Sequence, residues 1–299
     1  MSVLIVGSTA LDSIKTPHAE NPRLLGGSAS HAAVAASFFG PVKMVGVVGD
    51  DFPKKYVALY KKHRIDLTGL QIQDGKTFHW AGEYEVNMNN RRTLVTELGV
   101  FEKFTPHLPA AYKQSPFVLL ANIAPALQHH VLDQMARPKF VVADTMDLWL
   151  NIALEDLLRL LKRLDGFVLN DSEAHQLTQE DNVFAAMKKL HRLGPKYVII
   201  KKGSHGSILS GPKGHFICPA YPLPKVVDPT GAGDSFVGGL MGYLSTARGG
   251  VDANIRRAMT YGTVVASFCC EGFGLNRTTR VKRGEIDRRV AELEQLTWF

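Results

Sequence analysis

Apolar residues follow two different periods along the chain, and the two alternate from one segment to the next. Short β-branched runs predict buried strands at Val3–Gly7, Val42–Val48, Val118–Ala121, Phe140–Asp144, Val168–Asn170 and Val198–Lys202. Apolar residues that recur every three or four positions predict helices at Ser28–Phe39, Pro53–Arg64, Pro125–Met135, Leu154–Leu164 and Asn182–Leu193. Strands that alternate with helices indicate an α/β fold in which helices cover both faces of a mainly parallel sheet.

Two stretches interrupt this alternation. Lys76–Phe104 is polar and rich in β-forming residues, and it is too long for a bare connection. It predicts strands of its own, which would form a small β lid over one edge of the sheet. Ser207–Ala220 carries glycine and proline at its centre and predicts a hairpin. We expect residues 1–299 to form one domain, with the lid built mainly from about 76–104 and with about 12–25 as a further candidate segment.

The expected lid carries polar residues that suit a substrate pocket, namely Asn87, Asn89, Arg91 and Arg92. Strand alternation allows only one of the two arginines to point inward. An inward arginine would favour an anionic or phosphorylated acceptor, and a solvated lid face is the alternative. Because unpaired strand edges invite partners, a homodimer formed through the lid is a further hypothesis.

Composition narrows the class of protein. Apolar residues make up 45% of the 299 residues and charged residues 21%, which is typical of a globular protein. No apolar run approaches the roughly 20 residues that span a bilayer, and the first residues read as a strand without a basic leader. We therefore expect no membrane partner and a cytoplasmic location. Cys218, Cys269 and Cys270 form no paired framework and predict buried free thiols.

The net charge of +7 suits an anionic partner. The densest basic stretch lies near the C-terminus, between Arg277 and Arg289, and acidic residues interrupt it. It comes with no helix-turn-helix, zinc-finger or aromatic RNA-binding signature. We therefore expect a solvated face, with a contribution to nucleotide attraction as the alternative, and no nucleic-acid partner.

The most informative segment is Val226–Phe236, with the sequence VVDPTGAGDSF. A proline and two glycines predict a tight turn, and the amphipathic pattern that follows predicts a helix. The first N–H groups of a helix have no internal partner and attract anions. Gly231, Ala232 and Gly233 carry almost no side chain, so a phosphate could approach the backbone closely.

Asp234 is unexpected in such a turn, because a carboxylate repels the anion that it faces. The arrangement is reasonable if Asp234 is a general base that takes a proton from a substrate hydroxyl. The neighbouring N–H groups would then stabilise charge on the transferred phosphoryl group. The alternative is a helix cap, worth about 1 kcal/mol.

The whole run resembles the C-terminal signature of the ribokinase-like, or PfkB-type, carbohydrate kinases. Other parts of the chain resemble the same family in the same order: Asp12 after Gly7, the pair Gly26 and Gly27 before a helix, Asn170 with Glu173, and the turn with Lys202, Gly203 and Gly206. The resemblance covers nearly the full length, and the expected lid falls where family members carry one.

The resemblance implies a ribokinase-like, three-layer α/β/α fold and ATP-dependent phosphorylation of a hydroxyl on a sugar or sugar-like molecule. It implies that Asp234 is the base and that the turn from Gly231 to Gly233 is the anion hole. Asn170 and Glu173 would organise Mg²⁺ and its waters, and a plain helix cap is the alternative for this pair. The resemblance further places Lys202, Gly203, Gly206 and Thr230 at the nucleotide.

On the acceptor side the resemblance implies contacts from Asp12, Gly26, Gly27 and His31. His31 stands where the family often has an asparagine that holds the sugar, which argues against ribose itself. Further candidates for lining the acceptor cleft come at the end of a predicted strand and directly after it: Asp144, Asp147 and Trp149. Asp228 and the backbone near Thr230 resemble a monovalent-cation loop, so potassium is a hypothesis, with Cys269–Asn276 as the second half of the loop.

Two alternatives stay open. A nucleoside kinase of the same architecture fits the aromatic residues Phe78, Trp80, Tyr84 and Trp149, which could contact a base. A catalytically silent sugar- or nucleotide-binding regulator belongs to a different class, and it would not need Asp234. The sequence contains no Walker-type phosphate loop, no protein-kinase catalytic loop, no HExxH zinc motif and no hydrolase elbow.

Overall fold

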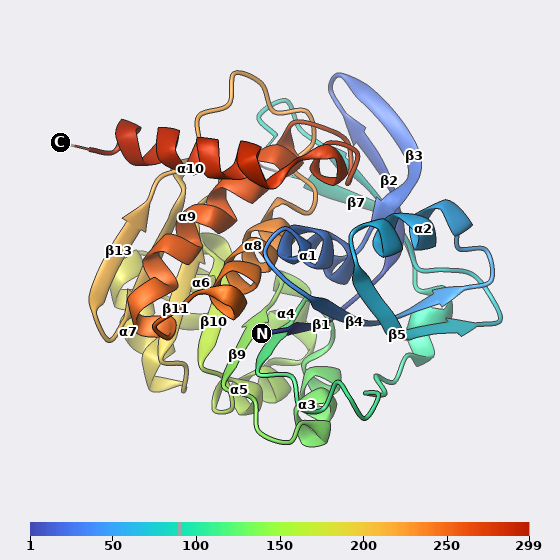
Figure 1. Ribbon diagram of the computed structural model, residues 1–299, viewed down its shortest axis with the longest axis horizontal. Helices are drawn as coiled ribbons and strands as arrows, with labels where there is room; N and C mark the ends of the chain where they lie inside the picture. The colour runs from blue at the N-terminus through green and yellow to red at the C-terminus, as the bar shows by residue number, and fades with distance from the viewer. Residues whose placement is uncertain (89–90, 299) are drawn as a thin grey trace.

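The computed structural model describes residues 1–88 and 91–298, and its centre is a large twisted sheet (Figure 1). Within the described residues this sheet has nine strands: β1 (Val3–Val6), β4 (Val42–Gly49), β5 (Ile65–Gln73), β8 (Phe117–Leu120), β9 (Phe140–Asp144), β10 (Gly166–Asn170), β11 (Tyr197–Lys201), β12 (Ser207–Gly211) and β13 (Gly214–Cys218). Their order is β13-β12-β11-β10-β9-β8-β1-β4-β5. Neighbours from β5 to β11 run parallel, and only the hairpin β12–β13 adds antiparallel pairs.

Helices cover both faces of the sheet: α1 (Ser28–Ser37), α2 (Lys54–Lys62), α3 (Pro125–Gln134), α4 (Asp147–Ile152), α5 (Leu154–Leu161), α6 (Asp171–Thr178), α7 (Val183–Arg192), α8 (Ala232–Thr246), α9 (Val251–Cys270) and α10 (Arg283–Leu296). Alternate residues of β1 belong to two separate cores, Val3 and Ile5 to one and Leu4 and Val6 to the other. This alternation follows from the two-residue period of a strand. The expected three-layer α/β/α architecture is therefore confirmed.

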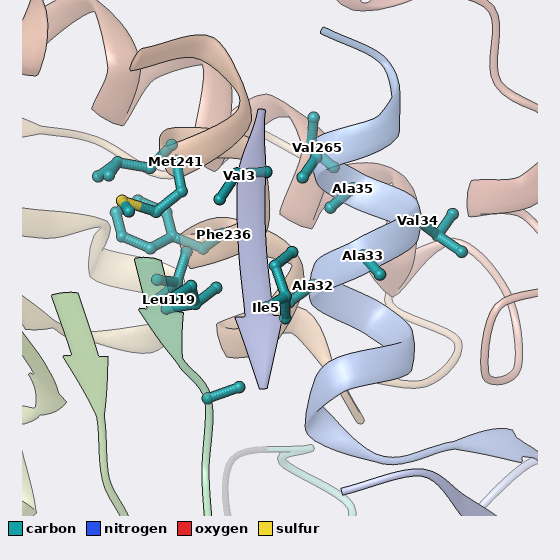
Figure 2. Close-up of a cluster of buried hydrophobic side chains, with 14 of the residues drawn as sticks. Val3, Ile5, Ala32, Ala33, Val34, Ala35, Leu119, Phe236, Met241 and Val265 are labelled. Carbon is teal, nitrogen blue, oxygen red and sulfur yellow. The ribbon is translucent and has the colours of Figure 1, made fainter. Parts of the chain in front are cut away.

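One core places α8, the helix that follows the glycine turn. Figure 2 shows Val3 and Ile5 of β1 between the alanines of α1 and Phe236 and Met241 of α8. Small residues let the two helices approach closely: a Cβ atom at Gly242 of α8 would lie 2.7 Å from the Cα of Ala36. As a result, the N-termini of α1 and α8 lie side by side.

A second, smaller sheet forms the lid and stands at the opposite side of the molecule from β13 (Figure 1). Its strands are β2 (Ala10–Thr16), β3 (Ala19–Gly26), β6 (His79–Tyr84) and β7 (Arg91–Glu97), in the order β3-β2-β6-β7. The β2–β6 pair is parallel and the other two pairs are antiparallel. Every residue of β7 is exposed, and one edge of this strand has no neighbour in the sheet order.

The predicted strands and helices are present, with ends shifted by at most three residues. The edge strand β5 was not predicted, since only two of its nine residues are buried. Cys218 and Cys269 are buried free thiols as predicted, whereas Cys270 is half-buried. Asn89 of the expected lid lies outside the described residues. Among the described helices, none combines the length and apolar composition that crossing a bilayer requires.

Candidate active site

The turn before α8 is held by a buried carboxylate. Asp228 is fully buried, and its two oxygens accept 2.9 Å hydrogen bonds from the N–H groups of Thr230 and Gly274. The expected second half of the loop, Cys269–Asn276, therefore does lie against the first. Gly231 caps α8 with a φ of 76°, a conformation that side chains rarely adopt, and a Cβ atom there would collide with the ring of His31.

The N–H groups of this turn are only partly used inside the protein. Ala232 donates to the carbonyl of Pro229 at 3.1 Å. Within the described residues, the N–H groups of Gly231 and Gly233 have no backbone acceptor. These two groups are therefore available to an anion in front of the helix, where the helix dipole also favours negative charge.

Asp234 lies in the first turn of α8 and is half-buried. Burial raises the pKa of its carboxyl group, and the positive charges of Lys201 and Arg91 oppose that rise. Its negative charge in turn acts on Asp12 and Asp144, so four charged side chains from different elements surround it. A carboxylate with a raised pKa is the better proton acceptor.

Asp12 is the buried acid on the acceptor side, with 5% of its surface exposed. Burial raises its pKa to about 7, and a hydrogen bond from the backbone of Gly27 works against that shift. A Cβ atom at Gly26 would collide with the Asp12 carboxylate, so only glycine fits there. The structure thus brings Asp12, Gly26 and Gly27 together at the start of α1, as the sequence led us to expect.

His31 lies beneath the turn. Its ring is 1% exposed and packs under Gly231, with Nδ1 at 3.7 Å from the Sγ of Cys269. Burial lowers the pKa of His31 to about 4, so the ring is neutral at physiological pH. Its Nε2 is buried and has no hydrogen-bond partner among the described residues. The ring supports the turn, and an acceptor contact through Nε2 stays a prediction.

A buried ion pair joins two strand ends next to the turn. The Nζ of Lys201 lies 2.9 Å from each carboxylate oxygen of Asp144, and the two side chains are 19% and 6% exposed. A Cβ atom at Gly233 would lie 3.1 Å from the same Nζ, so the ammonium group reaches the phosphate-binding turn. The negative charges of Asp144 and Glu173 outweigh burial and raise the pKa of Lys201.

Sequence reasoning missed Lys201 and chose its neighbour Lys202. The side chain of Lys202 instead lines a second cavity of about 380 Å³ beside α6 and α7. The missed signal was strand alternation. Lys201 ends β11 and Asp144 ends β9, both at the carboxyl edge of the sheet, where opposite charges on the same face can meet.

Asn170 and Glu173 form a reciprocal capping box at the start of α6. The Asn170 side chain accepts from the N–H of Glu173, and Glu173 Oε2 accepts from the N–H of Asn170, each at 2.7 Å. The pair therefore caps α6, and its role at Mg²⁺ stays a prediction. Burial raises the pKa of Glu173 to about 7, and the charges of Lys201 and Asp144 also act on this group, which places it beside the ion pair.

These residues suit a magnesium ion that is held mostly by water and phosphate. In residues 1–88 and 91–298, no group of three or more His, Cys, Asp and Glu is placed to form a metal cage. Magnesium usually takes one or two protein oxygens and keeps several waters. A nearby cation would also favour the ionised form of Glu173.

A cavity of about 560 Å³ opens beside the turn. Lys201, Gly203, Gly206, Ala232 and Gly233 are among the residues that line it. Its apolar wall comes from the loop before the turn and from α9, including Leu223, Val226, Ala266 and Cys270. The lid residues Asn87 and Met88 also reach this cavity. The volume, the mostly apolar lining and the single lysine suit a nucleotide.

The lid meets the site at one corner. The positive charge of Arg91 acts on both Asp12 and Asp234, whereas Arg92 pairs with Glu83 at 2.8 Å on the exposed side. The structure thus agrees with the expectation that only one arginine faces inward. The hydroxyl of Thr230, in the turn, donates a 3.1 Å hydrogen bond to the hydroxyl of Tyr84, in the lid.

Comparison with known proteins decides the family. The profile of the pfkB family carbohydrate kinases matches residues 6–281. The chain belongs to this family. It is therefore a kinase that transfers a phosphoryl group from ATP, with Mg²⁺, to a hydroxyl of a sugar-like molecule.

Several relatives of this pfkB kinase match over most of its length. A cytidine kinase from Thermococcus kodakarensis is 29% identical over 256 residues, which cover 83% of this chain and 90% of that protein. An aminoimidazole riboside kinase from Salmonella typhimurium is 26% identical, with 82% and 81% covered. The solved structure of Burkholderia thailandensis nucleoside kinase in complex with inosine has a TM-score of 0.80 at 20% identity, and the match covers 97% of this chain and 98% of that one. This structural match confirms the fold.

Proposed function

We propose that this pfkB kinase phosphorylates a hydroxyl on the ribose of a nucleoside, with Asp234 as the general base. The observation that carries the proposal is the position of Asp234. It stands at the mouth of the phosphate-binding turn, within the electrostatic reach of Asp12 on the acceptor side and of Lys201 on the nucleotide side. A base between two substrates is what transfer to an alcohol requires.

In the proposed reaction, Asp234 accepts the proton of the acceptor hydroxyl as that oxygen forms a bond to the γ-phosphorus of ATP. The bond to the bridging oxygen breaks, and ADP leaves with the electron pair. The N–H groups of Gly231 and Gly233 and the ammonium group of Lys201 stabilise the negative charge on the phosphoryl oxygens. Mg²⁺ neutralises phosphate charge when it is bound, and Asn170 and Glu173 would orient its waters.

Asp12 would hold the acceptor. Its two oxygens can accept hydrogen bonds from neighbouring hydroxyls of a ribose, and a bound ligand would satisfy a carboxyl that has little access to water. The remaining sequence-predicted contacts, Gly203, Gly206 and Thr230, are proposed at the nucleotide side, and the first two line the 560 Å³ cavity.

A nucleoside is favoured over a free sugar by two observations. The relatives that cover most of this chain include a cytidine kinase, an aminoimidazole riboside kinase and an adenosine kinase. The second observation is that two aromatic residues lie on elements next to candidate acceptor contacts: Trp80 is the strand partner of Asp12, and Trp149 follows the strand that ends at Asp144. Trp80 lies 5.6 Å from the guanidinium of Arg91, and Trp149 is held in place by a 2.7 Å hydrogen bond to Asn122. Both rings could stack on a base.

The test is a coupled ADP-release assay with MgATP. The acceptors are cytidine, inosine, adenosine, ribose, fructose and fructose 6-phosphate. We expect at least one nucleoside to exceed ribose by about 100-fold in kcat/KM, since the base adds contact area to the same hydroxyl group. Turnover of sugars but no nucleoside would reject the nucleoside assignment, and preference for the sugar phosphate would point to Arg91 as an anion-binding residue. If none of these acceptors stimulates ADP release, neither the sugar class nor the nucleoside class is supported.

We further propose that K⁺ binds near Asp228. Both carboxylate oxygens already accept backbone N–H groups, so a cation would contact the surrounding carbonyls and feel the buried charge. Equal initial rates in potassium and in tetramethylammonium would reject this site.

The exposed edge of β7 also makes a homodimer through two lids a reasonable proposal. Light scattering would test it. A mass near 32.9 kDa at all protein concentrations would show that the edge stays unpaired.

A further inference from the structure

Tyr84 links the lid directly to the phosphate-binding turn. It is the last residue of β6, its side chain is 6% exposed, and its hydroxyl accepts the 3.1 Å hydrogen bond from Thr230. The two residues are 146 positions apart in the chain. Thr230 directly precedes Gly231, the cap of α8, so this bond reaches the turn from the lid side.

The backbone of Thr230 is held by the main domain, and its side chain is held by the lid. Its N–H donates to Asp228 Oδ1 at 2.9 Å, and its carbonyl accepts from the thiol of Cys269 at 3.3 Å. The hydroxyl is the remaining polar group, and it goes to Tyr84. Any displacement of the lid therefore changes the restraint on the residue next to Gly231.

The same corner of the lid faces both substrates. Tyr84 is the strand partner of Arg91, whose charge acts on Asp12 and Asp234 on the acceptor side. The connection after Tyr84 places Asn87 and Met88 in the wall of the nucleotide cavity. Among the described residues, this end of the lid thus borders Asp12, Asp234 and the nucleotide cavity.

We propose that Tyr84 is a positioning residue that couples closure of the lid over the acceptor to the conformation of the phosphate-binding turn. With the lid closed, its hydroxyl fixes Thr230 and thereby the N–H groups of Gly231 and Gly233. With the lid open, the turn lacks this restraint. Because coupling between two sites is reciprocal, a nucleotide bound at the turn changes the lid. The proposal depends on phosphoryl transfer, and not on whether the acceptor is a nucleoside.

The lid contains its own reporter, Trp80 on β6. Replacement of the other two tryptophans, Trp149→Phe and Trp298→Phe, makes Trp80 the only tryptophan in the chain. Titration with MgADP should then change the Trp80 emission. In this background Tyr84→Phe and Thr230→Val, each of which removes one hydroxyl of the pair, should reduce the amplitude at least threefold. The double variant should behave like either single variant, since both remove the same bond.

Tyr56→Phe is the matched control. Tyr56 of α2 also contacts the lid, where its hydroxyl donates to the carbonyl of Arg23 at 3.2 Å. This hydrogen bond does not involve the phosphate-binding turn. We expect the full emission change in this variant. A full response in Tyr84→Phe, or additive losses in the double variant, would overturn the proposal. Thermal unfolding checks that each variant is folded, and Thr230→Val removes the same bond should Tyr84→Phe fail to fold.

Kinetics give a second readout, with cytidine as acceptor. Tyr84→Phe should lower kcat about fivefold, the effect of one neutral hydrogen bond, and change each KM less than about twofold. A merely structural role would lower the unfolding temperature and leave kcat unchanged. If cytidine is not phosphorylated, the kinetics use the best acceptor found in the ADP-release assay. If no nucleoside is phosphorylated, the nucleoside proposal fails on its own, and the MgADP titration still decides the role of Tyr84.

Discussion

The two sheets of this kinase are stabilised in different ways. The central strands of the large sheet are buried on both faces, and all residues of β1, β8 and β9 are buried. In the small sheet, every residue of β7 is exposed, and half of the residues of β3 are exposed as well. Hydrophobic burial fixes the large sheet and the inner strand β2 of the small one, whereas the outer part of the lid depends on strand pairing and on polar contacts such as Tyr84–Thr230 and Arg92–Glu83.

This difference corresponds to a division of roles. A rigid core can hold Asp234, Lys201 and the glycine turn in fixed positions, which phosphoryl transfer needs. An element with few buried apolar side chains opens at a lower free-energy cost, and substrate-covering elements are drawn from this class. We therefore expect variants of the large sheet to change stability and chemistry, and variants of the lid to change mainly its communication with the site.

The largest expected effect is on stability. Leu119→Ala in β8 removes a side chain that is 1% exposed and should lower the free energy of unfolding by about 4 kcal/mol, because it leaves a cavity. The same change in the lid, Leu94→Ala, alters a residue that is 49% exposed and should cost less than about 0.5 kcal/mol. Urea unfolding of both variants measures the contrast, and similar losses would mean that the lid belongs to the core.

Lys201→Met should be the next largest change. It leaves Asp144 buried without its cation, at a cost of about 3 kcal/mol, and it should weaken MgADP binding. Lys202→Met is the control, since Lys202 lies outside this ion pair and lines the second cavity. Denaturant unfolding and calorimetric titration with MgADP separate the two lysines. A larger loss of MgADP binding in Lys202→Met would restore Lys202 as the nucleotide contact.

Asp234→Asn tests the chemistry of the large-sheet side. We expect turnover to fall at least about 100-fold, as for the loss of a general base, while MgADP binds as before. Asp252→Asn is the matched control, because Asp252 also lies in the first turn of a helix, α9, but pairs with Lys196 and Tyr197. Steady-state assays with the best acceptor give the comparison. Near-normal turnover of Asp234→Asn would reject Asp234 as the base.

The smallest effect is a pH dependence with opposite signs in the two regions. Burial raises the pKa of Glu173 from 4.5 to about 7, so the folded state binds this proton more tightly, and the free energy of unfolding falls as pH rises from about 4.5 to 7. Glu173→Gln should remove that slope and keep the capping box.

In the lid, Lys15 and Arg92 lower the pKa of Glu83, so the contribution of Glu83 to the free energy of unfolding is lost as pH falls. Unfolding curves of Glu173→Gln and Glu83→Gln between pH 4 and 8 measure how each substitution changes the pH dependence of the free energy of unfolding. Changes of the same sign in both variants would contradict the opposite pKa shifts of Glu173 and Glu83.

Much of the fold and the centre of the site could be predicted, because local patterns carry them. The two periods of apolar residues indicated the strands and helices, and the run from Asp228 to Asp234 indicated a glycine turn that leads into a helix with an acid in its first turn. Strand β5 was missed, since an edge strand buries few residues and so has a weak pattern. The role of His31 was also beyond prediction: a ring under Gly231 depends on the packing of α1 against α8, which no local pattern encodes.

The sequence by itself determined the class of fold, the glycine turn and the acid that follows it, since these depend on neighbours within a few residues. Only the tertiary structure decided that Lys201 rather than Lys202 joins Asp144, that Arg91 rather than Arg92 faces the site, and that Tyr84 meets Thr230. These pairs lie on separate strands and loops. Their contacts follow from sheet order, strand register and helix packing, which many distant residues set together.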